Sequence, residues 1–272
     1  MRIHQVDAFT NRVFGGNPAA VCVLPQPAPD HWMQALALEM NLSETAFAWL
    51  EADGYRLRWF TPAVEVDLCG HATLATAHTL WETGQLLANQ IARFYTRSGL
   101  LTCVRNGNRI EMDFPAKIAT EVPAPVGLAE ALGVDPLFVG NNKMDYLVEI
   151  DSEERLRNLQ PNLSELGRLP VRGIIVTARS QSPAFDFVSR FFAPAAGVNE
   201  DPVTGSAHTA LAPYWAAKLG KTQMTGYQAS ARGGVVNVQL EGDRVLLGGQ
   251  AVTVMQADLL AEAPDLGERI RR

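Results

Sequence analysis

Short apolar and alternating segments dominate the first half of the chain and predict β-strands. Residues 2–9 alternate between apolar and polar side chains, and residues 19–24 form a short apolar run. Further strands are expected at 44–50, 55–60, 100–104 and 109–114. The sequence Asn106-Gly107-Asn108 separates the last two strands and is typical of a tight hairpin turn.

Helical patterns are fewer, and they differ in how much surface they should bury. Asp30–Met40 is amphipathic, with Pro29 and Asp30 at its start. Gly70–Glu82 is rich in Ala, Leu and Thr and nearly uncharged, so this helix should be buried on all sides. A second apolar helix is expected over Gly205–Leu219, where Pro213 must remove a backbone hydrogen bond or introduce a kink.

The second half of the chain repeats features of the first half. RWFTPA at 58–63 is matched by RFFAPA at 190–195. After a short insertion, the matches continue at pairs that include Gly70 and Gly205, Ala72 and Ala207, and Gly107 and Gly242. A duplicated unit explains these matches better than coincidence between two Ala-rich helices, because they extend through an unrelated hairpin. The sequence therefore predicts an α+β fold of two pseudo-symmetric lobes, each a mostly antiparallel strand barrel around a central apolar helix.

A proline-rich segment divides the two halves. PAKIATEVPAP at 115–125 has little periodicity and predicts a linker. The expected lobes are 1–116 and 117–272, with an approximate boundary and with terminal strands that are free to cross between them.

Charge and apolar run length exclude several classes of partner. The net charge is −6 and no basic cluster is present, which argues against nucleic acid and anionic membrane surfaces as partners. No apolar run approaches the roughly 18 residues of a membrane helix. The start lacks the apolar core of a signal peptide, and three cysteines cannot all pair. We therefore expect a cytoplasmic protein.

Two equivalent loops lead into the apolar helices and carry candidate polar residues. They are EVDLCGHAT at 65–73 and NEDPVTGSA at 199–207. The first N–H groups of a helix lack intrahelical partners and carry partial positive charge, so these two helix starts suit a substrate carboxylate. Asp67 and Asp201 are either parts of such a site or simple helix caps. The candidate substrate-binding positions are Gly70, Ala72, Gly205 and Ala207.

Three further side chains could take part in chemistry. His71 follows the first helix start as a candidate neutral donor, and Ser206 is its counterpart in the repeat. A structural role for His71 is the alternative. Glu44 begins a strand with apolar neighbours, which suits either an edge-strand or capping carboxylate or a partly buried general base whose pKa is raised by desolvation.

Other motifs are absent from the sequence. Cys69 has no cysteine counterpart at 201–206, which excludes a racemase that uses two thiols. The chain has no P-loop, no His/Cys spacing typical of zinc and no glycine-rich strand–helix turn of the dinucleotide-binding type. We expect neither a cofactor nor a metal.

The order of several short motifs resembles that of PhzF-like proteins, the phenazine-biosynthesis isomerase family. The motifs are QVDAFT at 5–10, GNPAAV at 16–21, NLSET at 41–45, RWFTP at 58–62, DLCGHAT at 67–73 and EDPVTGSA at 200–207. The resemblance covers nearly the whole chain. It implies a diaminopimelate-epimerase-like fold with the active site in the cleft between two lobes, a homodimer, and catalysis without cofactor or metal.

The resemblance also implies residue roles. The family's named reaction is isomerisation of a dihydro-hydroxyanthranilate by a proton shift. Glu44 would move the proton, His71, Asp201 and Ser206 would be the other functional polar groups, and the helix starts at Gly70 and Gly205 would receive the substrate carboxylate. The leading hypothesis is a cofactor-independent isomerase of a small carboxylic acid. An amino-acid racemase or epimerase and a non-catalytic metabolite-binding protein remain alternatives.

Overall fold

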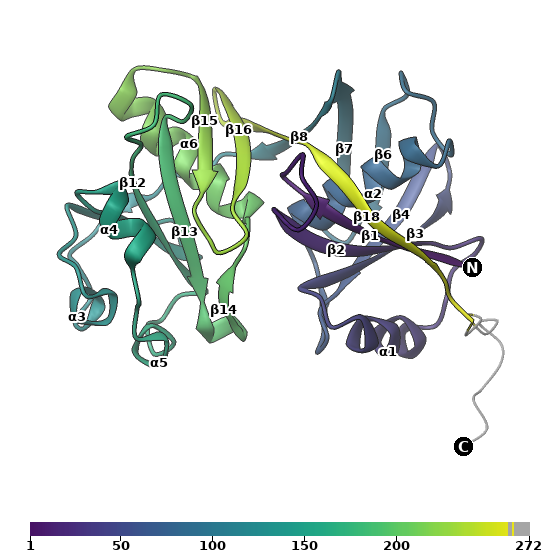
Figure 1. The fold of residues 1–272 in the computed structure, drawn as a ribbon, viewed down its shortest axis with the longest axis horizontal. Coiled ribbons are helices and arrows are strands. Elements are labelled where there is room, and N and C mark those ends of the chain that lie inside the picture. The colour runs from purple at the N-terminus through teal and green to yellow at the C-terminus, as the bar shows by residue number, and fades with distance from the viewer. Residues whose placement is uncertain (261–262, 264–272) are drawn as a thin grey trace. The chain divides into compact units, whose positions relative to one another are not determined.

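The computed structural model describes residues 1–260 and residue 263, and it has the predicted α+β composition. The chain divides into two compact units (Figure 1). Unit 1 comprises Met1–Met112 together with the described residues from Gly249 onward, and unit 2 comprises Asp113–Gly248. The division falls a few residues before the expected linker, within a strand. The predicted second lobe extended to residue 272, and its last part, 261–262 and 264–272, lies outside the described residues.

Unit 1 contains two helices and most of the strands expected in the first half. The helices are α1 (Asp30–Met40) and α2 (Gly70–Glu82). The strands are β1 (Arg2–Ala8), β2 (Asn17–Val23), β3 (Glu44–Glu51), β4 (Gly54–Phe60), β5 (Glu65–Val66), β6 (Ala92–Thr96), β7 (Gly99–Asn106) and β18 (Ala251–Asp258). Strand β18 pairs with β1, so the C-terminal strand of the described chain belongs to unit 1. Strand β8 (Arg109–Pro115) crosses the division between the units.

Unit 2 contains a longer central helix and several short helices that the sequence did not predict. The helices are α3 (Leu128–Leu132), α4 (Glu153–Asn158), α5 (Leu163–Leu166), the 3-10 helix η1 (Pro194–Ala196) and α6 (Gly205–Leu219). The strands are β9 (Thr120–Glu121), β10 (Phe138–Asn141), β11 (Asp145–Glu149), β12 (Gly173–Arg179), β13 (Phe187–Ala193), β14 (Val198–Asp201), β15 (Gln223–Gln228), β16 (Gly234–Glu241) and β17 (Arg244–Gly249). Strand β9 lies inside the expected linker and pairs with β10.

The order of strand pairings is the same in both units. In unit 1, β2 runs parallel to β3, β3 pairs antiparallel with β4, and β4 runs parallel to β6, which pairs antiparallel with β7. In unit 2 the same pairings join β11, β12, β13, β15 and β16. The residue matches found in the sequence therefore correspond to a repeated supersecondary unit.

An arginine–glutamate pair recurs at equivalent places in the repeat. Arg58 donates two hydrogen bonds to Glu65, at 2.7 and 2.6 Å. Arg190 makes the same two-bond contact with Glu200, at 2.7 and 2.9 Å. Each guanidinium also lies over a phenylalanine ring two residues further along its strand. Paired and stacked in this way, each arginine is held by geometry that lysine could not reproduce.

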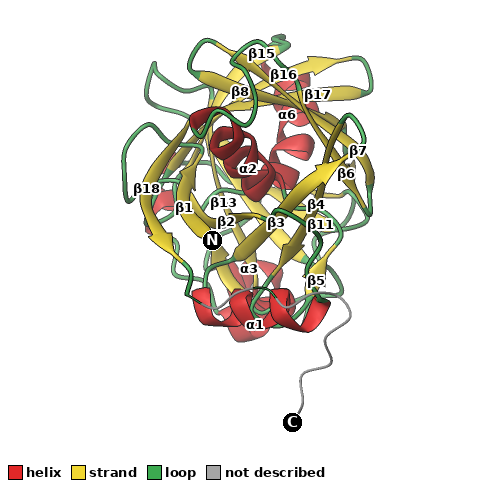
Figure 2. Cartoon of the chain, turned by 90° about the vertical axis from the view of Figure 1, so that its right-hand side faces the viewer, coloured by secondary structure: helices red, strands yellow, loops and turns green. Residues whose placement is uncertain are grey.

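The central helix of unit 1 is buried along most of its length, as predicted. Helix α2 packs against β1, β2, β3 and β18 (Figure 2). Its buried threonines satisfy their hydroxyls within the helix, because Thr73, Thr76 and Thr79 each donate to the carbonyl four residues earlier. Among the described residues, no helix combines the length and apolarity needed to cross a membrane.

The proline inside α6 leaves one helical carbonyl without its usual partner, and a residue from outside the helix donates to that carbonyl. Pro213 has no N–H and leaves the carbonyl of Thr209 without its usual helical partner. The backbone N–H of Lys117, in the segment expected to be a linker, donates to this carbonyl at 3.0 Å. The proline thus provides an acceptor that ties the segment to the central helix of unit 2.

A close backbone approach beside α6 gives a test of core packing. The Phe187 and Trp215 rings stack with centroids 5.8 Å apart, and both side chains are buried. A Cβ atom at Gly226 would lie 2.5 Å from Cε2 of Phe187. Gly226→Ala should therefore lower the free energy of unfolding by about 1–3 kcal/mol. Urea denaturation measures this, with Gln223→Ala, an exposed change on the same strand, as the control. Equal stability of the two variants would show that the Phe187 ring can move freely.

Candidate active site

Glu44 and His71 lie together in unit 1. Glu44 is the first residue of β3, and His71 is the second residue of α2. Their Oε2 and Nε2 atoms are 3.2 Å apart, and both side chains are largely buried. Strand β3 lies between β2 and β4, so the alternative of an edge-strand carboxylate is wrong. The distance is well within the limit that a shared proton-transfer role requires.

The contacts of His71 assign its tautomer. The Nδ2 atom of Asn17 lies 3.2 Å from Nδ1 of His71. An amide nitrogen only donates, so Nδ1 accepts and the ring hydrogen is on Nε2, which faces Glu44. Burial lowers the pKa of His71 to about 3. The imidazole is therefore neutral at pH 7, as predicted, although burial is the cause and not the helix start.

Cys69 contacts the same imidazole ring. Its Sγ atom is 3.5 Å from Nδ1 of His71. Ligand atoms of Glu44, Cys69 and His71 all lie within 4.8 Å of one another, as in some metal sites. Cys69 lies nearer to Nδ1 of the ring and Glu44 lies nearer to Nε2.

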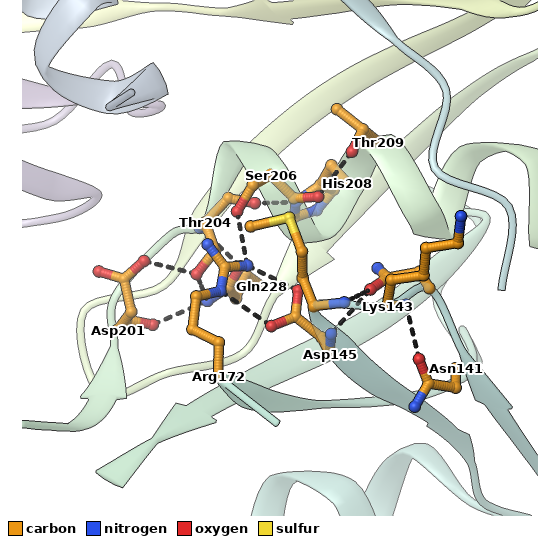
Figure 3. Close-up of polar contacts among 12 residues, drawn as sticks. Asn141, Lys143, Asp145, Arg172, Asp201, Thr204, Ser206, His208, Thr209 and Gln228 are labelled. Carbon is orange, nitrogen blue, oxygen red and sulfur yellow. Dashed lines mark hydrogen bonds and ion pairs between the residues drawn. The ribbon is translucent and has the colours of Figure 1, made fainter. Parts of the chain in front are cut away.

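Neither aspartate caps a helix, so the capping alternative is wrong. The N-cap residues are Cys69 for α2 and Thr204 for α6, and neither helix has a side-chain capping bond. Asp67 is exposed near Arg97. Asp201 instead belongs to a polar network in unit 2 (Figure 3).

The network around Asp201 fixes the start of α6. The hydroxyl of Thr204 donates to Oδ2 of Asp201 at 2.5 Å, and the Thr204 N–H donates to Oε1 of Gln228 at 2.9 Å. The Gln228 amide in turn donates to the Asp201 carbonyl at 2.7 Å. Asp201 is therefore held by both its backbone and its carboxylate.

Ser206 contacts an ion pair that sequence reasoning missed. Nη2 of Arg172 lies 3.0 Å from Oγ of Ser206 and donates to it (Figure 3). The same guanidinium donates two hydrogen bonds to Asp145, at 2.9 and 2.6 Å. Asn17 was also missed. Asn17 begins β2 and Asp145 begins the equivalent strand β11, but the residue matches of the repeat start only at 58 and 190 and gave no signal for either residue.

The remaining histidines play other parts. His208 is fully buried in α6, and its Nδ1 donates to the Thr204 carbonyl at 2.8 Å. Burial lowers the pKa of His208 to about 4. His78 is partly buried, with Nε2 3.2 Å from the Thr253 hydroxyl. The expectation of core or surface positions for both is confirmed.

A duplicated α+β fold with a buried carboxylate–imidazole pair is typical of an enzyme that acts on small molecules. The family model described as "Phenazine biosynthesis-like protein", PhzC-PhzF, matches residues 6–257. The chain belongs to this family.

Relatives and solved structures agree with that assignment. An uncharacterized isomerase of Halalkalibacterium halodurans is 58% identical, over 95% of this chain and 98% of its own. A human phenazine biosynthesis-like domain-containing protein is 39% identical, over 95% and 99%. The crystal structure of a PhzF-family protein from Enterococcus faecalis has a TM-score of 0.91 and 41% identity, over 95% and 99%. The name of the first relative agrees with the expected enzyme class.

Proposed function

We propose that this protein is a cofactor-independent isomerase that moves a proton within a small carboxylic acid. Membership of the family supports an isomerase, as does the name of the bacterial relative. The observation that carries the mechanism is the contact between the Glu44 carboxylate and the neutral imidazole of His71. A substrate similar to a dihydro-hydroxyanthranilate, a homodimer and a cytoplasmic location remain expectations from the sequence.

Glu44 acts in this proposal as both base and acid. It removes a proton from a carbon next to a carboxyl-bearing or unsaturated carbon and returns it to another carbon. His71 contacts the carboxylate at 3.2 Å and, as a neutral ring, brings no positive charge to it. Asp201 and Ser206 contribute to the same reaction from unit 2. The helix starts at Gly70, Ala72, Gly205 and Ala207 bind the carboxylate and stabilise the anion that forms.

The duplication favours one base over two. Thr45 pairs with Phe60 in unit 1, and Ile174 pairs with Phe192 in unit 2. Phe60 and Phe192 are equivalent in the repeat, so the counterpart of Glu44 is Gly173, which has no side chain. A racemase with a matched pair of carboxylates, one from each unit, therefore lacks its second base.

Isotope exchange tests the proposal. The protein is incubated in D₂O with dihydro-hydroxyanthranilate, related cyclic carboxylic acids and a panel of amino acids, and products are identified by mass spectrometry and chromatography. We expect an isomer with a shifted double bond from at least one cyclic acid. Deuterium at the α-carbon of an amino acid, with inversion, would instead establish a racemase. Binding without turnover of any acid would favour a metabolite-binding protein.

A further inference from the structure

The guanidinium of Arg172 is held in a single orientation. Two hydrogen bonds join it to Asp145, and its Cζ lies 5.2 Å from the centre of the Phe191 ring. Gly173 makes this stacking possible, because a Cβ atom there would lie 2.4 Å from Cζ of Phe191. A charged side chain fixed by an ion pair and a ring is preorganised for binding.

The same guanidinium keeps donors available. Nε and one hydrogen of Nη2 bind Asp145, and the other hydrogen of Nη2 binds Ser206. Nη1 carries two more hydrogens and has no hydrogen-bond partner among the described residues. The Arg172 side chain is 33% exposed, so a ligand can reach it.

The hydroxyl of Ser206 is a second hydrogen-bond donor, beside the guanidinium of Arg172. Its Oγ accepts from Arg172, so its own hydrogen is directed elsewhere. Within the described part of the chain, that hydroxyl donates to no other residue. The hydrogen bond from Arg172 therefore leaves the Ser206 hydroxyl free to donate to a ligand. Nη1 of Arg172 is a second donor beside it.

Asp145 determines the charge of this donor pair. Its carboxylate is 1% exposed and neutralises Arg172, so the site offers hydrogen-bond donors without net positive charge. A hydroxyl or keto oxygen can accept from such donors. A second carboxylate would bring a full negative charge close to Asp145, and that repulsion disfavours it.

We propose that Arg172 and Ser206 bind an uncharged oxygen substituent of the substrate, and that Asp145 makes the site reject a second carboxylate. Arg172 also positions the Ser206 hydroxyl. The inference rests on the proposed function for its carboxylic-acid substrate, and it adds a specificity determinant to unit 2.

Calorimetric titration with matched aromatic acids tests this specificity. The probes are benzoate, the ortho, meta and para hydroxybenzoates, and the corresponding benzenedicarboxylates. In the native protein we expect one hydroxybenzoate to bind at least about tenfold more tightly than benzoate and than the dicarboxylate of the same geometry.

Asp145→Asn is the decisive variant, because it keeps the shape of the side chain and removes only the charge. We expect the affinity for the dicarboxylate to rise at least about tenfold, so that the preference reverses. The double variant Asp145→Asn/Arg172→Gln leaves no unpaired charge and should bind all probes as weakly as benzoate. Asp151→Asn, a surface change that removes the same charge, is the matched control and should leave the preference unchanged.

Three results would overturn the inference. They are an unchanged preference in Asp145→Asn, an equal loss of affinity for all probes in that variant, and no binding of any probe by the native protein at millimolar concentration. Deuterium exchange separates this inference from the proposed function. Exchange with an unchanged preference contradicts the inference alone, whereas a reversed preference without exchange into any acid contradicts the proposed isomerase alone.

Discussion

Glu44→Gln should lower the rate of isomerisation by at least about a thousandfold, near the upper range for loss of a general acid–base group. Glutamine has the shape of glutamate, and its carbonyl oxygen can occupy the same place beside Nε2 of His71. The change therefore removes the base while it keeps the local packing. Steady-state kcat, measured with whichever acid the exchange experiment identifies, gives the effect.

A glutamate on the same strand provides the control. Glu51 ends β3 and pairs with Arg56 at 2.6 Å. Glu51→Gln should leave kcat within about twofold, because the residue lies at the far end of the strand from Glu44. Urea denaturation of both variants shows whether each is folded. A folded Glu44→Gln enzyme that keeps its rate within tenfold would place the base elsewhere, and Cys69 would then be the next group to test.

The three long helices were predicted well because the residues along each of them favour a helix. Apolar residues and small residues repeat along α1, α2 and α6, and these helices begin and end where the pattern does. Short elements such as α5 and β9 were missed. Helix α5 is a single turn whose cap is the Asn162 side chain, and β9 exists because β10 pairs with it. Such short elements depend on tertiary contacts, which the local sequence does not predict.

The candidate site was predicted unevenly for a similar reason. Glu44 and His71 were paired through the family resemblance, and their spacing in sequence carried no signal of contact. Asn17 lies 54 residues from His71, and Arg172 lies 27 from Asp145 and 34 from Ser206. The parallel pair of β11 and β12 brings Asp145 and Arg172 together, and packing of strand ends against the starts of α2 and α6 makes the other two contacts.

The repeat explains why two similar units carry different chemistry. In unit 1 a buried imidazole meets a carboxylate at the start of β3. In unit 2 the equivalent helix position is Ser206, and glycine replaces the carboxylate, which gives the Phe191 ring room to lie beneath Arg172. One copy of the unit thus holds the candidate base, and the other holds the candidate donors.

The protein should lose stability steeply as the pH falls below about 6.5. His71 and His208 have pKa values of about 3 and about 4 in the folded state, against 6.5 for an unburied histidine. Below pH 6.5 the unfolded chain therefore binds protons that the folded chain does not, and each proton favours unfolding. At about 1.4 kcal/mol per pH unit, each histidine removes about 3 kcal/mol from the free energy of unfolding between pH 7 and pH 4.

Urea denaturation across this pH range isolates the contribution of His208. The side chain donates to the Thr204 carbonyl, and Gln can donate in the same way without gaining a proton. His208→Gln should therefore reduce the loss of stability between pH 7 and pH 4 by about 3 kcal/mol. His31→Gln, an exposed change in α1, should leave the pH dependence unaltered. If both variants match the native slope, His208 must take up its proton in the folded state, which would require water to reach a side chain that is closed to solvent.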